Sequence, residues 1–96
     1  MPFGVIHRFA GGTQEQYENA IKAVHPDGGK GLPEGQTLHV AGPTDDGWVI
    51  LAVHDSAASW EHFRDTVLVP GLANVENGLQ GPPDETTFEV YRVETT

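Results

Sequence analysis

Two apolar runs joined by a tight polar turn constrain this fold most strongly. Residues 37–43 and 47–54 are rich in side chains that favour β-strands, and the stretch Thr44–Gly47, "TDDG", supplies the Asp and Gly that hairpin turns favour. We therefore expect a β-hairpin with Asp45 and Asp46 at its tip. That tip predicts three opposed pairs: Pro43 with Trp48, Ala41 with Ile50, and His39 with Ala52.

Side-chain alternation predicts that the histidines of this hairpin share one sheet face. His39 and His54 then lie one diagonal step apart across the two strands. The other face of the second hairpin strand is wholly aliphatic, which predicts a central strand that is buried on both sides. The aliphatic face consists of Val49, Leu51 and Val53, and the histidine face consists of Thr37, His39, Ala41, Trp48, Ile50, Ala52 and His54.

A strand and a helix are expected before the hairpin. Phe3–Phe9 is short, apolar and closed by glycines, as is typical of a strand. Thr13 and Gln16 have the spacing of a capping box, and the apolar residues that follow recur at helical intervals. The helix should end before Pro26, which disfavours helical geometry in the residue preceding it. Its apolar residues are Tyr17, Ala20, Ile21 and Val24.

A second helix and a last strand are expected after the hairpin. Asp55 or Ser56 can cap the helix, and Pro70 should end, kink or restart it. The segment Thr86–Val93 alternates as a strand. The apolar face of the helix is expected to consist of Trp60, Phe63 and Val67, which are spaced i, i+3 and i+7.

The predicted order is strand, helix, strand, strand, helix, strand. Two right-handed crossovers around a hairpin give a ferredoxin-like βαββαβ fold of the α+β class, with a four-stranded antiparallel sheet and both helices on one face. A chain of 96 residues forms one such domain, 1–96. The helices cover only one sheet face, so we expect a second copy of the chain to bury the other in a homodimer.

Charge and composition exclude several partners. Five Lys and Arg stand against fourteen Asp and Glu, for a net charge of −9, so nucleic acid is not an expected partner. The absence of cysteine excludes disulfides and thiolate metal sites. No apolar run approaches the ~20 residues that span a bilayer, and the N-terminus shows no signal-peptide pattern. We therefore expect a cytoplasmic protein without membrane contact.

Three stretches of the chain carry a resemblance to a known family: "HRFAGGTQEQYENAIKAVHPDGG", "LHVAGPTDDGWVILAVHDSAASWEHF" and "EVYRV". They resemble small bacterial proteins of the dimeric α+β barrel superfamily, the group that includes antibiotic-biosynthesis monooxygenase-like domains. The resemblance implies a homodimeric α+β barrel with a small-molecule cleft between the sheet and the helices of each subunit. Similar proteins include cofactor-independent oxygenases of polyketide phenols, haem-degrading enzymes, muconolactone-isomerase-like proteins and stress-response proteins.

Histidines are the candidate catalytic residues. Their unperturbed pKa of ~6.5 allows proton transfer near neutral pH, and phenols or enols must lose a proton before they react with oxygen or tautomerise. His39 is the predicted base, and His54 and His7 are predicted to orient the substrate. Each can instead be a hydrogen-bonded structural residue. His25 is expected to interact with the carbonyl end of the first helix, and His62 to face solvent or the subunit interface.

Aromatic side chains are the candidate substrate contacts, because a flat aromatic ligand requires an apolar, aromatic-lined cleft. Each can also serve only as a core or interface anchor. No HxH, HxxxH or HExxH spacing occurs, so no metal ligands are predicted. The predicted substrate-binding residues are Tyr17, Trp48, Trp60 and Phe63.

Three functions are consistent with this sequence. The first is a cofactor-independent monooxygenase or isomerase that acts on an aromatic or enolisable metabolite with a histidine base. The second is a non-catalytic, stress-related dimeric module that binds a small hydrophobic or aromatic ligand. The third is a haem-binding protein. Convergence of His39 and His54 on an open cleft would favour catalysis over the binding module, and a closed cleft would favour the binding module. Haem binding would show itself by colour.

Overall fold

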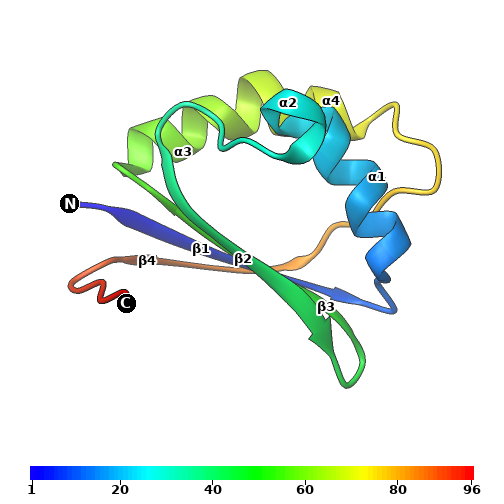
Figure 1. Cartoon of the computed structure of the whole chain (residues 1–96), viewed down its shortest axis with the longest axis horizontal. Helices are drawn as coiled ribbons and strands as arrows, with labels where there is room; N and C mark the ends of the chain where they lie inside the picture. The colour runs from blue at the N-terminus through cyan, green and yellow to red at the C-terminus, as the bar shows by residue number, and fades with distance from the viewer.

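The computed structural model describes residues 1–96 and contains one antiparallel sheet with the strand order β2-β3-β1-β4 (Figure 1). The predicted α+β class and four-stranded sheet are confirmed, and the order is consistent with a ferredoxin-like fold. The strands are β1 (Phe3–Ala10), β2 (Gln36–Thr44), β3 (Gly47–His54) and β4 (Asp84–Glu89). The helices are α1 (Gln14–Val24), α2 (Pro26–Gly29), α3 (Ala57–Phe63), the π-helical segment η1 (Arg64–Leu68) and α4 (Val69–Leu72).

The helices lie together on one side of the sheet (Figure 1). Thr13 and Gln16 form the predicted capping box at the start of α1, and Ser56 caps α3 by accepting a hydrogen bond from the backbone N–H of Ser59. The buried cluster joins sheet and helices through Val5, Val24, Trp60 and Phe63. No helix combines the length and the hydrophobicity that crossing a membrane requires.

The predicted hairpin register is confirmed near the turn, where His39 pairs with Ala52. The first residues of β2 differ from the prediction, because a bulge lies between Gln36 and Leu38. Gln36 therefore pairs with His54 and is buried, whereas Thr37 is exposed. The prediction that Thr37 shares the histidine face was wrong, since one extra residue reverses the alternation of side chains.

The second helix departs from regular α-geometry at η1. Pro70 has no backbone N–H, and its ring would clash with the carbonyl four residues earlier. The chain widens into a π-helix there, and the N–H of Val69 donates to the carbonyl of Arg64. One extra residue per turn rotates the following side chains. Leu68 therefore faces the interior, while Val67, predicted on the apolar face, is 38 % exposed.

The last strand ends earlier than the alternation of side chains predicted. Glu89 pairs with Phe3, the first residue of β1, so no strand lies opposite the residues beyond it. The N–H of Val90 still donates to the carbonyl of Pro2, and Tyr91 is then 93 % exposed. The prediction of a strand through Val93 was wrong for this reason. The same pairing extends the start of the strand back to Asp84.

Candidate functional site

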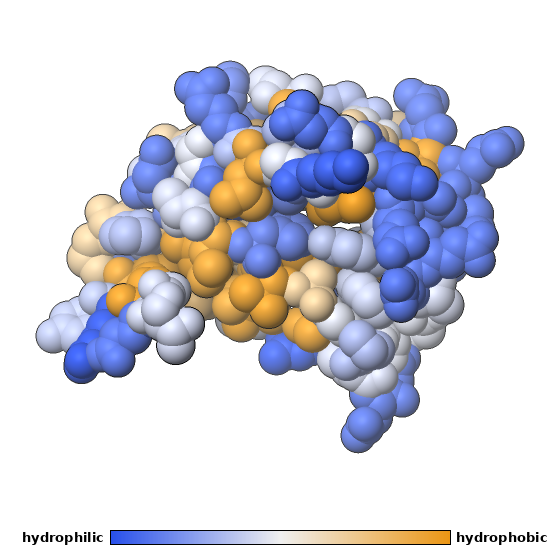
Figure 2. Space-filling model, in the orientation of Figure 1, coloured by the Kyte–Doolittle hydropathy of each residue, from blue (hydrophilic) through white to orange (hydrophobic).

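A cavity of about 570 Å³ lies between the sheet and the helices. Its walls are mostly apolar, and apolar surface gathers around this hollowed region in the space-filling view (Figure 2). The sheet forms the floor, to which β3 contributes Ile50 and Ala52. Helices α1, α3 and α4 form the roof together with η1, and the loop around Pro82 closes one side. The size and lining are those of a small-molecule site.

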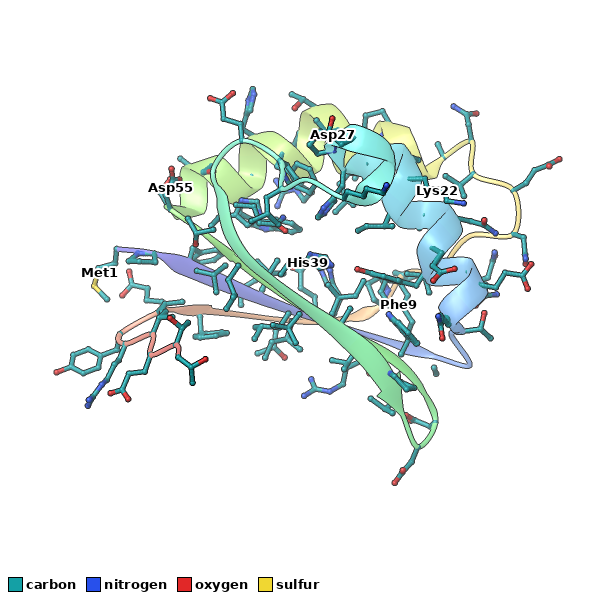
Figure 3. The ribbon with its side chains drawn as sticks, in the orientation of Figure 1. Met1, Phe9, Lys22, Asp27, His39 and Asp55 are labelled. Carbon is teal, nitrogen blue, oxygen red and sulfur yellow. The ribbon has the colours of Figure 1, made fainter.

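His39 and Phe9 point from the sheet towards the helices (Figure 3). Both line the cavity, where Tyr17 meets His39. The Tyr17 hydroxyl lies 2.6 Å from Nε2 of His39, and both side chains are half-buried. Helix α1 supplies Tyr17 because its capping box fixes the start of the helix one turn earlier. Hairpin register supplies His39, which points to the helix-covered face together with Ala52.

The interior side of His39 is held by a chain of buried polar groups. Its Nδ1 lies 3.0 Å from Oε1 of Gln36, and Nε2 of Gln36 lies 3.3 Å from Nε2 of His54. Gln36 is 7 % exposed and His54 is fully buried, with no hydrogen-bond partner at Nδ1. His54 therefore reaches the cavity only through Gln36 and His39, because it does not line the cavity itself.

Burial, together with a smaller contribution from the nearby His25, lowers the pKa of His39 to about 4. The two imidazole rings are 4.7 Å apart between centroids and pack edge to face. Burial also lowers the pKa of His25, although its hydrogen bond with the carbonyl of Gly31 opposes this shift. Both rings are therefore neutral at pH 7, and His39 is a weak base.

Tyr17 is protonated under the same conditions, because burial raises the pKa of its hydroxyl. Its ring packs against Trp48, with 5.2 Å between ring centroids. Trp48 does not line the cavity, so it supports Tyr17 from behind and makes no direct contact with the space. The hydrogen-bonded pair of Tyr17 and His39 thus presents an uncharged phenol and an uncharged imidazole to a ligand.

A second polar group lines the cavity near its β4 side. Nε2 of His7 lies 2.8 Å from a carboxylate oxygen of Glu85, which faces it across the pairing of β1 with β4. The imidazole packs beside the ring of Trp60 at 5.6 Å between centroids. Arg64 and Phe63 complete this part of the wall. An imidazole bonded to a carboxylate is a group that can donate or accept a proton.

The structure thus brings His39, His7, Tyr17, Trp60 and Phe63 to one cavity, and places His54 and Trp48 behind it. Four further polar residues of the site were not predicted from the sequence: Gln36, His25, Arg64 and Glu85. Gln36 faces the cavity because of the bulge in β2, and Glu85 lies there because of the register of β4. His25 was assigned only to the end of the first helix, although its neighbour Pro26 marked a turn.

No protein-family model, curated protein or solved structure matches this chain. The assignment of the site therefore depends on its geometry. The structure contains no group of three or more His, Asp or Glu side chains arranged to hold a metal ion. What the cavity offers is an apolar space with two polar groups on its wall, each centred on an imidazole.

Proposed function

We propose that this protein binds a flat aromatic or enolisable metabolite and moves a proton on it without a bound cofactor, as an isomerase or a monooxygenase. The observation that carries the proposal is the 2.6 Å contact of Tyr17 with His39 at the wall of an apolar cavity. Both nitrogens of His39 already have partners. A ligand oxygen therefore exchanges its proton with His39 through the Tyr17 hydroxyl.

The low basicity of His39 restricts the substrate. An ordinary phenol has a pKa of ~10, and the pKa of His39 is about 4. Moving a proton from such a phenol to this imidazole is uphill by ~8 kcal/mol, because each pKa unit corresponds to ~1.36 kcal/mol. A more acidic hydroxyl reduces this difference. We therefore favour substrates with acidic enol or phenol groups, such as enols conjugated to a carbonyl.

His7 and Glu85 are proposed to act at the other end of the substrate. His39 on β2 pairs with Ala52 on β3, and Ala52 pairs with Val5 on β1. His7 lies two residues further along β1, so two strand spacings and two residues separate it from His39. Strand spacing and rise place the Cα atoms of the two histidines ~12 Å apart on the same face. A ligand of two fused rings can thus extend from one histidine towards the other.

Two proton transfers at these positions would tautomerise an enol. The oxygen loses its proton to Tyr17 as the Tyr17 proton passes to His39, and a carbon gains a proton from His7. The enol becomes a ketone, and the solvent restores both histidines to their starting states. These proton transfers together are the reaction of an isomerase. If dioxygen instead adds to a C–H carbon of the electron-rich enolate, a hydroperoxide forms and loses water, so one oxygen atom stays as a new carbonyl and the substrate supplies all of the electrons. The same first step then serves a monooxygenase.

We also propose that the chain belongs to the dimeric α+β barrel superfamily and acts as a homodimer. The sheet face away from the helices carries Val40, 52 % exposed, and Phe88, 40 % exposed. Val49 and Leu51 on the same face of the central strand are only half-buried in one copy. A second sheet packed on this face would bury these side chains.

A non-catalytic binding module is the second candidate. The weak basicity of His39 and the mostly apolar wall favour it, because both features suit retention of a ligand without chemistry. The position of His54 behind the cavity favours it too, because His39 and His54 do not converge on the open space. Such a module would bind aromatic ligands and leave them unchanged. The third candidate, a haem-binding protein, would show the visible absorption of haem after incubation with it.

Deuterium exchange into 2-naphthol tests the proposed activity. This bicyclic compound presents a hydroxyl and exchanges its C1 proton through its keto tautomer, and NMR in D₂O follows the exchange. We expect the protein to accelerate it at least ~10-fold, an effect of ~1.4 kcal/mol on the barrier. Tyr17→Phe and His39→Gln should abolish the acceleration, and His62→Gln, a change at an exposed residue of α3, should preserve it. Binding of 2-naphthol without acceleration would support the second candidate.

A further inference from the structure

The buried amide of Gln36 joins the two histidines of the hairpin. Its oxygen lies 3.0 Å from Nδ1 of His39 and its nitrogen lies 3.3 Å from Nε2 of His54. An amide oxygen only accepts hydrogen bonds, and an amide nitrogen only donates them. Nδ1 of His39 must therefore carry a proton, and Nε2 of His54 must not.

The donor-to-acceptor direction of these hydrogen bonds also determines how Tyr17 meets the cavity. A neutral imidazole carries one proton, so Nε2 of His39 is an acceptor when Nδ1 is protonated. The Tyr17 hydroxyl then donates to His39 across the 2.6 Å contact. Its only proton is engaged, and the Tyr17 oxygen has lone pairs left for a ligand. The polar wall of the cavity is therefore an acceptor at this point.

We propose that Gln36 is a positioning residue that fixes His39 as its Nδ1–H tautomer and thereby selects ligands that present a hydroxyl, rather than a carbonyl, to Tyr17. The role of Gln36 in catalysis rests on the proposed function, whereas the tautomer and the ligand preference do not. If the amide oxygen and nitrogen of Gln36 exchanged places, donor and acceptor would be swapped in every hydrogen bond from His54 to Tyr17. Tyr17 would then donate to the ligand, and carbonyl compounds would be preferred.

Local structure holds Gln36 in this position. The bulge after Gln36 turns its side chain to the helix-covered face, opposite His54. Its backbone N–H donates to the carbonyl of Pro33, and the carbonyl of Gly35 accepts from the N–H of Asp55. These bonds anchor the start of β2 to the end of β3. The amide is thus enclosed, with both of its ends committed to histidines.

The tautomer of His39 can be measured on the unaltered protein. Long-range ¹⁵N–¹H NMR spectra at pH 7 distinguish a protonated from an unprotonated ring nitrogen. We expect protonated Nδ1 and unprotonated Nε2 in His39. The opposite tautomer would overturn the proposal. Gln36→Met, which keeps length but removes both polar atoms, should yield a mixture of tautomers, and Gln14→Met on the exposed start of α1 should leave His39 unchanged.

Matched ligands test the preference for a hydroxyl. We expect 2-naphthol to bind about 5- to 10-fold more tightly than 2-methoxynaphthalene, as one net hydrogen bond allows. Tyr17→Phe should remove this ratio, and Gln36→Met should reduce it. Equal affinities, or tighter binding of 2-acetylnaphthalene than of 2-naphthol, would contradict the proposal. Failure of deuterium exchange with the expected tautomer and ratio intact would refute the catalytic function alone.

Discussion

Acid should destabilise this protein through His39, and the size of the effect can be calculated. The pKa of His39 is lowered from 6.5 to about 4 in the folded chain. The unfolded chain therefore binds a proton at His39 more readily than the folded chain does. The contribution of the neutral His39 ring to the free energy of unfolding is fully present above pH 6.5 and is lost as the pH falls towards 4. If the whole pKa shift acts on stability, the free energy of unfolding falls by ~2.5 kcal/mol between pH 7.5 and 4.5. Because His39 is partly exposed, solvent screening reduces this to ~1–1.5 kcal/mol.

Urea unfolding of the wild type and of His39→Gln at the two pH values measures this effect. Glutamine does not titrate, so the variant should lose ~1–1.5 kcal/mol less than the wild type between pH 7.5 and 4.5. At a slope of ~1–1.5 kcal/mol per molar urea this is a difference of ~1 M in midpoint shift. His62→Gln is the matched control and should follow the wild type. Equal losses in the wild type and His39→Gln would refute the assignment of a burial-depressed pKa to His39.

Three further changes test the packing around the site. Gly4→Ala should destabilise the fold by ~1–2 kcal/mol, because its Cβ would overlap the ring of Phe88, and adding Phe88→Ala should remove that clash in thermal unfolding. Ala52→Leu on the cavity floor should weaken binding of 2-naphthol at least ~10-fold in fluorescence titrations, because the added carbons occupy ligand space. Val40→Lys should yield monomers in light scattering if the open sheet face joins two copies, whereas Ala58→Lys on the helical side should not.

The hairpin could be predicted because two local signals agree. The Asp45–Asp46 tip sets which residues face each other, and alternation then sets the face of His39. The structure confirms the pairing of His39 with Ala52. The capping box of Thr13 predicted the start of α1 for the same kind of reason, since its bonds span only three residues.

The parts of the site that escaped prediction depend on distant or irregular geometry. Gln36 faces the interior only because a bulge adds one residue, and no local pattern marks that residue. Leu68 replaces Val67 on the interior because the chain accommodates Pro70 by a π-helix, one of several available responses. Glu85 meets His7 because β1, nearly 80 residues earlier, sets the register of β4.

An NMR titration of the His39 ring, with and without 2-naphthol, tests most directly whether this histidine acts in the cavity. The structure predicts a pKa of about 4 in the free protein, well below the ordinary value of 6.5. Binding of 2-naphthol at Tyr17 should shift the His39 resonances and change this pKa, and Tyr17→Phe should weaken the response. A pKa near 6.5 that is indifferent to the ligand would contradict the account, because His39 would then be neither buried nor coupled to the ligand through Tyr17.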